Sequence, residues 1–170
     1  MTDLRGHVTE LQDCFFRMKF LHQAEDILGP ARAPEGRFHH DGQRALYLSA
    51  SPEGCVVASR MYMKPDDPPR GIFPVRVVSD RIVDLRDRLA TDHFDIDVTH
   101  RAARWQEDRA AGRRAPTWDI SDRARALGLH GMLYASRSDP RKTHLTLFDW
   151  NSEGGAEVAV AGPIVPWQDD

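Results

Sequence analysis

Residues 36–54 read GRFHHDGQRALYLSASPEG and join a loop, a strand and the start of a helix. Glycine and proline recur over residues 29–42, so this segment is predicted to be a loop. Residues 45–49 (ALYLS) follow as a short apolar strand. Residues 51–53 (SPE) then supply a capping hydroxyl, a proline and a carboxylate, which predicts a helix that runs to about Met63. Binding groups are expected first on the loop, because loops held by a rigid scaffold often carry function.

The segments on either side of this stretch alternate between helix and strand patterns. Residues 3–12 predict a short polar helix, so that 1–13 form an N-terminal helical extension, and residues 14–20 predict a partly buried strand. Further strands are expected at 72–78, 81–85, 132–135, 144–148 and 157–161, and helices over 96–112 and from Thr117 or Asp119 to Gly128. The pattern predicts a mixed α/β (α+β) fold: one domain over 1–170 with a central mixed β-sheet flanked by helices.

The composition is that of an ordinary globular protein. The chain has 170 residues, of which 41% are hydrophobic and 29% charged, and its net charge is −3. The acidic balance argues against direct nucleic-acid binding, which usually needs a basic surface. Only Cys14 and Cys55 are present, and neither a signal peptide nor a stretch long enough to span a membrane is found. These features predict a cytoplasmic protein that does not enter a membrane.

The common enzyme classes that are defined by a local motif are not supported by this sequence. The sequence has no Walker loop, no GxGxxG, no GxSxG and no HExxH. His39 and His40 are adjacent but lack a third ligand at a familiar spacing, so no metal is expected. A different reading of the same pair, as the acid or base of an unrelated small enzyme, stays open because histidine titrates near neutrality.

A long-range pattern is more specific than any local motif. It consists of GRFHHDGQRALYLSASPEG (36–54), IVDL (82–85), ALGLHGMLYASR (126–137) and LTLF (145–148). The order and spacing of these segments, over about residues 15–150, resemble the RES family of bacterial toxins, named for its arginine, glutamate and serine. The resemblance implies a core similar to that of ADP-ribosyltransferases. It also implies NAD as the substrate and no metal.

The resemblance assigns roles to four side chains. Arg37 matches the family arginine, and its planar fork suits the NAD pyrophosphate; Arg17 is a weaker match that would support it. Tyr47 matches the strand tyrosine and Ser136 the family serine, and both are expected near the nicotinamide or its ribose. The family glutamate would stabilise the positive charge that grows on the ribose as nicotinamide leaves.

The position of that glutamate is occupied by Ala58. Glu53 is not expected to replace it, since five residues turn a helix by about 140° from the required face. Ser59 cannot carry a negative charge at neutral pH. The chain is therefore expected to be catalytically crippled while still binding NAD. The alanine indicates either a degenerate family member or an active toxin that was changed so that its host survives producing it. The other site residues still match the family, which favours the changed toxin.

The resemblance also implies a biological setting. Family members are the toxins of type II toxin–antitoxin pairs, and they cleave NAD and pass ADP-ribose to water, phosphate or a protein acceptor. The expected partner is an antitoxin similar to Xre-type helix-turn-helix proteins, which would cover the cleft. The alternative from a different class is a non-catalytic NAD-binding, nucleotide-binding or protein-interaction module in which Ala58 is the working residue.

Overall fold

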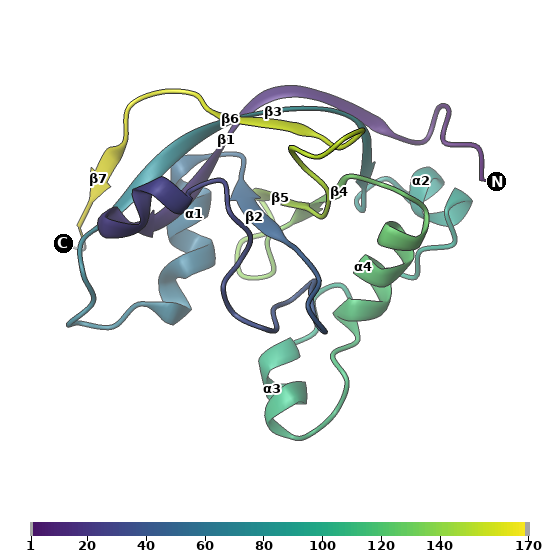
Figure 1. Ribbon diagram of the computed structural model, residues 1–170. Coiled ribbons are helices and arrows are strands. Elements are labelled where there is room, and N and C mark those ends of the chain that lie inside the picture. Colours follow the sequence, from purple (N-terminus) through teal and green to yellow (C-terminus); the bar gives the residue numbers. More distant parts are fainter. Residues whose placement is uncertain (1, 169–170) are drawn as a thin grey trace.

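A computed structural model describes residues 2–168 of the chain as a mixed sheet with short helices around it (Figure 1). The strands are β1 (Thr9–Phe20), β2 (Leu46–Ser49), β3 (Arg70–Asp84), β4 (Gly131–Ala135), β5 (Thr143–Leu147), β6 (Glu157–Val160) and β7 (Val165–Trp167). The helices are α1 (Pro52–Ser59), α2 (Arg88–His93), α3 (Trp105–Ala110) and α4 (Thr117–Ala126), with 3-10 turns at Leu21–Asp26 and Arg60–Tyr62. The predicted mixed α/β class is confirmed.

The strand pairings close into a ring. The sheet runs in the order β1-β2-β5-β4-β3-β6, and β1 also pairs with β3. The strand β7 pairs with the first residues of β3. Most pairs are antiparallel, and β3 and β4 are parallel. The two long strands β1 and β3 arch over the shorter ones in Figure 1. The sheet is therefore curled rather than flat, which gives it an inside and an outside.

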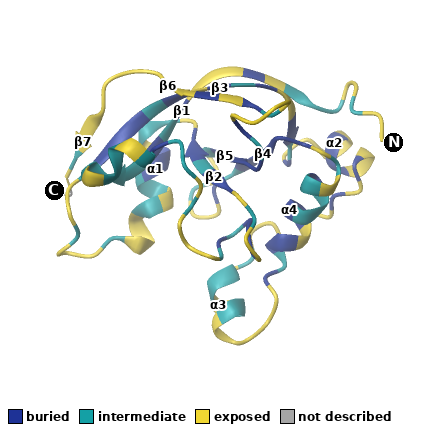
Figure 2. Cartoon of the chain, in the orientation of Figure 1, coloured by how far each residue is buried: buried dark blue, intermediate teal, exposed yellow. Residues whose placement is uncertain are grey.

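Alternation along the strands divides the core into two parts, because successive side chains point to opposite faces. Leu145 and Leu147 point to the inside, where they pack in a cluster with side chains of β1 and β3. Met132 and Tyr134 point to the outside and pack with side chains of α2 and α4. Figure 2 shows that the buried positions gather along the strands and on the inner sides of these helices. The outer cluster anchors the wall that carries the site described below.

The predicted helix over residues 3–12 is wrong. Residues 9–20 form a single strand, β1, in which Leu11 and Phe15 are buried and pair with β3. Val8 and Leu11 are spaced as on a helix face, but the long ladder with β3 satisfies more backbone groups than a short polar helix would. The N-terminal extension is thus part of the sheet from Thr9 onward.

Two other predictions are corrected. Residues 72–78 and 81–85 were expected as two strands, but β3 runs unbroken from Arg70 to Asp84, because Ser79 stays in the ladder opposite Leu11 across an irregularity in β1. The helix expected over 96–112 is reduced to α3, Trp105–Ala110, preceded by turns. Within residues 2–168, no helix is long and apolar enough to cross a membrane.

Candidate functional site

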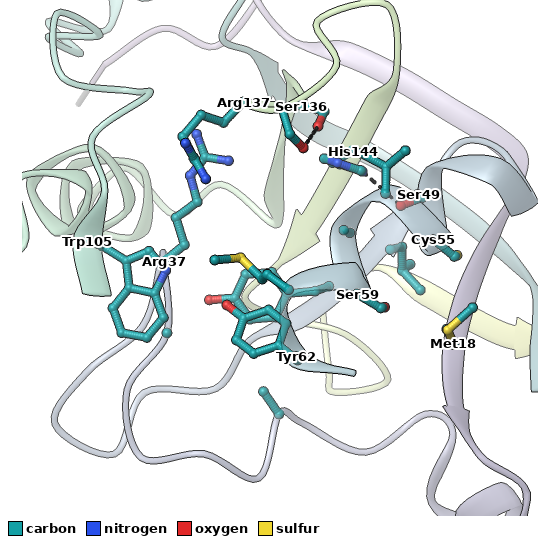
Figure 3. A pocket seen from close by; sticks show the side chains of 18 of the residues that line it. Met18, Arg37, Ser49, Cys55, Ser59, Tyr62, Trp105, Ser136, Arg137 and His144 are labelled. Atoms are coloured by element: carbon teal, nitrogen blue, oxygen red, sulfur yellow. Dashed lines mark hydrogen bonds between the residues drawn. The ribbon is translucent and has the colours of Figure 1, made fainter. Parts of the chain in front are cut away.

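A cavity of about 650 Å³ opens between the loop before β2, the helix α1 with its 3-10 extension, the helix α3 and the end of β4 (Figure 3). Its size is in the range of small-molecule sites. The five positions singled out in the sequence all line it: Arg17, Arg37, Tyr47, Ala58 and Ser136. They come from β1, the loop, β2, α1 and the end of β4, so the fold gathers residues that are up to 119 positions apart in the chain.

Arg37 lies at one end of the cavity with its charge only partly satisfied. Its guanidinium carbon is 5.0 Å from the centre of the Phe38 ring and 5.3 Å from that of Tyr134, and Nη2 donates to the carbonyl of Arg101. Its Nε is buried and has no partner among the residues described. Burial lowers the pKa of Arg37, and the nearby charge of Arg137 lowers it further. In Figure 3 these two arginines point toward each other, which makes this end suitable for an anion.

Tyr47 holds the turn that carries Arg37. The Tyr47 hydroxyl accepts from the backbone N–H of Phe38 at 3.0 Å and lies 2.7 Å from Nδ1 of His39. Nε2 of His39 lies 2.8 Å from the Ala33 carbonyl, which can only accept, so Nε2 carries the proton and the Tyr47 hydroxyl donates to Nδ1. The turn packs so closely that a side chain at Gly36 would lie 2.3 Å from the His39 ring. The Tyr47 hydroxyl therefore fixes the geometry of the turn.

His144 is more buried than Arg37 and Arg137. It stands opposite Ser49 of β2 and Tyr134 of β4 in the sheet register, and its Nδ1 is 2.8 Å from the Ser49 hydroxyl. The side chain is 6% exposed. Burial lowers the pKa of His144 to about 4, with a smaller contribution from the charge of Arg37. The imidazole is therefore neutral at physiological pH.

Ala58 is exposed on the cavity wall in the last turn of α1. Glu53, in the first turn, does not line the cavity, as its position on the helix predicted. Two carboxylates do line it, but Glu35 makes a bidentate ion pair with Arg109 at 3.0 Å, and Glu107 pairs with Arg104. Among residues 2–168, no carboxylate without an ion pair faces the cavity.

Ser136 and Arg17 also make hydrogen bonds within the protein. Just after β4, the Ser136 hydroxyl accepts from the N–H of Asp139 at 3.3 Å and lies 3.4 Å from the Ser138 hydroxyl, where either oxygen can donate. Arg17 donates from Nη1 to the carbonyls of Ile27 and Gly29, the latter at 2.8 Å. Burial lowers the pKa of Arg17 to about 10, with Asp26 acting in the opposite sense. Arg17 thus ties β1 to the beginning of the loop.

The two adjacent histidines of the loop have structural partners. His39 is engaged at both ring nitrogens, as described above. His40 lies between Asp41 and Asp122, each 2.8 Å from one of its nitrogens, and stacks on Trp118 with ring centres 4.4 Å apart. In the part of the chain that the structure describes, no group of three or more His, Cys, Asp or Glu is placed to hold a metal. With all four nitrogens occupied, neither histidine has a nitrogen free to act as an acid or base in the cavity.

Four further side chains line the cavity and were not predicted as site residues from the sequence: His144, Ser49, Arg137 and Trp105. For His144 and Ser49, the sequence did contain a signal. Both lie on strands, and they alternate with leucines that were expected to be buried, so they had to share one face. Which face that was depended on the pairing of β2 with β5, and the sequence does not show this pairing.

Tyr47→Phe is expected to lower the free energy of unfolding by about 1–3 kcal/mol, because the Phe38 N–H and the His39 ring lose a buried partner. Urea denaturation of the two proteins measures the difference. Tyr62→Phe is the control, since that side chain is 52% exposed and is expected to change stability little. Equal denaturation midpoints for Tyr47→Phe and the unchanged chain would contradict the role given to the hydroxyl.

Stability is expected to fall as the pH drops from about 6.5 to about 4. The pKa of His144 is about 4 in the folded protein and near 6.5 when unfolded, so in this window the unfolded chain binds more protons. A shift of this size corresponds to about 3 kcal/mol. The measurement is urea denaturation at pH 7, 5.5 and 4. His144→Gln should flatten the dependence, whereas the exposed-site control His22→Gln should leave it in place.

The chain is similar to known proteins in its sequence and in its fold. The model of the RES domain family matches residues 14–170, which extends the resemblance seen in the sequence beyond residue 150. Among solved structures, the fold is similar to a chain in the crystal structure of the M. tuberculosis MbcT–MbcA toxin–antitoxin complex, with a TM-score of 0.57 and 14% identity over 94% of this chain and 86% of that one. No curated protein sequence matches. The family match covers nearly the whole chain, and we conclude that the chain belongs to the RES domain family.

Proposed function

We propose that this chain is the toxin of a toxin–antitoxin pair, built to cleave NAD and to pass ADP-ribose to water, phosphate or a protein, and that Ala58 cripples its catalysis. The observation that carries the proposal is that positions 37, 47, 58 and 136 meet on one cavity. Membership of the RES family and the likeness of the fold to a chain of a toxin–antitoxin complex support it.

The charges of the cavity match the parts of NAD. Arg37 and Arg137 form a cationic end without a carboxylate between them, which suits the pyrophosphate. Arg17 was expected to support that contact, but its Nη1 bonds to the loop, so we assign it to holding the loop in place. Tyr47 holds the turn by its hydroxyl and lines the cavity, and the Ser136 hydroxyl lies beside the cationic end.

The chemistry needs a negative charge at position 58. When the bond between nicotinamide and ribose breaks, nicotinamide leaves with the electron pair and the ribose becomes a cation, until an acceptor oxygen forms the new bond. A carboxylate on the wall at position 58 would stabilise this cation more than it stabilises the bound NAD. Glu35 and Glu107 are held by arginines and do not take its place.

The proposed function also includes a protein partner, an antitoxin. The likeness to a chain from the MbcT–MbcA complex supports a protein partner that covers the cavity, and we propose one similar to Xre-type helix-turn-helix proteins. Met61 and Tyr62, which line the cavity, are 59% and 52% exposed. Large apolar side chains left open to solvent at the mouth of a site are a typical feature of surfaces that meet another protein.

Titration calorimetry with NAD tests the proposal on the chain as it is. We expect binding, together with no loss of NAD when the mixture is analysed by chromatography after several hours. ADP-ribose should also bind, because it keeps the pyrophosphate that Arg37 is proposed to hold. If neither ligand binds, the proposal fails.

The second candidate is a non-catalytic module that binds NAD or another nucleotide, or a protein. The observation that favours it is the lack, within residues 2–168, of a cavity carboxylate outside an ion pair. The two candidates differ in whether a glutamate introduced at position 58 should make the chain consume NAD.

A further inference from the structure

The floor of the cavity differs in character from its cationic end. Two of its buried polar side chains, Ser49 and His144, are 3% and 6% exposed, and Tyr134 lies beside them in the same cross-strand row. None of these groups carries a charge at neutral pH, since burial keeps His144 neutral and raises the pKa of Tyr134. A ligand with both charged and neutral polar parts would therefore place its neutral part at this floor.

The hydrogen bond to Ser49 sets the tautomer of His144. Nδ1 lies 2.8 Å from the Ser49 hydroxyl, and both groups are buried. If Nδ1 donated, the hydroxyl proton could turn only to the sulfur of Cys55, which is a weak acceptor, and this costs free energy. If the hydroxyl donates to Nδ1, its proton has a good acceptor. The neutral ring then carries its own proton on Nε2.

Nε2 is the part of His144 that is open to a ligand. No hydrogen-bond partner for it is found among residues 2–168, and the residue lines the cavity. Ser136 is a diagonal neighbour on the same face, because its N–H bonds to the carbonyl of Lys142, two positions before His144. In Figure 3 the His144 ring lies between the Ser49 and Ser136 side chains. The N–H of His144 thus lies next to the Ser136 hydroxyl, which is also 3.4 Å from the Ser138 hydroxyl.

We propose that His144 is a specificity-determining residue that donates from Nε2 to the carboxamide oxygen of nicotinamide, with Ser49 as the positioning residue that fixes its tautomer. This rests on the function proposed above. A carboxamide oxygen is neutral and accepts readily from an uncharged N–H. An imidazolium in its place would repel both Arg37 and the positively charged nicotinamide ring, so a histidine held neutral is suited to this position.

The test compares NAD with ADP-ribose, which lacks nicotinamide, by calorimetry on the unchanged chain and its variants. His144→Phe combined with Ser49→Ala removes both members of the pair and keeps the ring volume. We expect this variant to bind NAD about 5- to 10-fold more weakly, the effect of one lost neutral hydrogen bond, and to bind ADP-ribose within about 2-fold of the unchanged chain. His144→Gln keeps an N–H near the position of Nε2 and should retain most of the NAD affinity.

The outcomes separate the two proposals. Equal weakening for NAD and ADP-ribose, or no weakening for either, would overturn the role of His144 and leave the proposed function standing. Failure of the unchanged chain to bind either ligand would overturn both. Nitrogen-15 shifts of the unchanged chain give a readout that does not depend on a ligand: the proposal requires a protonated Nε2 and an unprotonated Nδ1 on His144 at pH 7.

Discussion

Ala58→Glu is expected to give a protein that consumes NAD at least about 10²- to 10³-fold faster than the unchanged chain, the usual size of the effect when one group that stabilises transition-state charge is added or removed. Ala58 is exposed on the cavity wall, so a longer side chain there can extend into the cavity without displacing core residues. Glu35 and Glu107 stay bound to their arginines, so the new carboxylate would be the one free to face a ribose cation.

The measurement is the loss of NAD followed by chromatography, on protein made in a cell-free system or together with a neutralising partner. The products then identify the acceptor as water, phosphate or protein. Ala58→Gln is the matched control, because it has nearly the same shape as glutamate without the charge and should remain inactive. If Ala58→Glu binds NAD but does not consume it with water, phosphate or lysate supplied, the non-catalytic module becomes the correct assignment.

The parts of the fold that the sequence predicted are those in which a local signal and the final environment agree. The helix beginning at Ser51 is one: its hydroxyl does cap the chain, accepting from the Gly54 N–H at 3.1 Å, and Pro52 is the first helical residue. The expected helix over residues 3–12 failed because the ladder partner of residues 9–12, residues 78–82, lies far away in the chain. The closure of the strands into a ring had no local signal for the same reason.

In the site, too, the features with a local signal in the sequence were predicted, and those that depend on distant parts of the chain were not. Arg37, Tyr47 and position 58 are close in sequence and were found by their spacing, and the cavity brings them together with Ser136. Their detailed roles were not visible in the sequence, because those depend on partners such as His39, whose tautomer is set by the Ala33 carbonyl. His144 was missed since its place at the cavity floor follows from the register between β2, β5 and β4.

Arg37→Met is expected to weaken the binding of both NAD and ADP-ribose by about 10²-fold, the loss that follows when two charge-assisted hydrogen bonds to a pyrophosphate are removed. Methionine keeps an unbranched apolar stem over the Phe38 and Tyr134 rings. Calorimetry measures the affinities, and the dependence of NAD binding on salt should become weaker with one cation fewer in the cavity.

The stability of the same variant separates a binding role from a structural one. The Arg37 side chain is half-buried, its buried Nε has no partner among residues 2–168 and its pKa is lowered, so the fold bears a cost to hold it. Arg37→Met should therefore unfold at the same denaturant concentration as the unchanged chain or a higher one. Arg88→Met is the control, since that side chain is 91% exposed and lies outside the cavity, and it should change neither binding nor stability. Undiminished NAD binding by Arg37→Met would show that the cationic end does not hold the pyrophosphate, whereas a large loss of stability would show that Arg37 is retained for the fold.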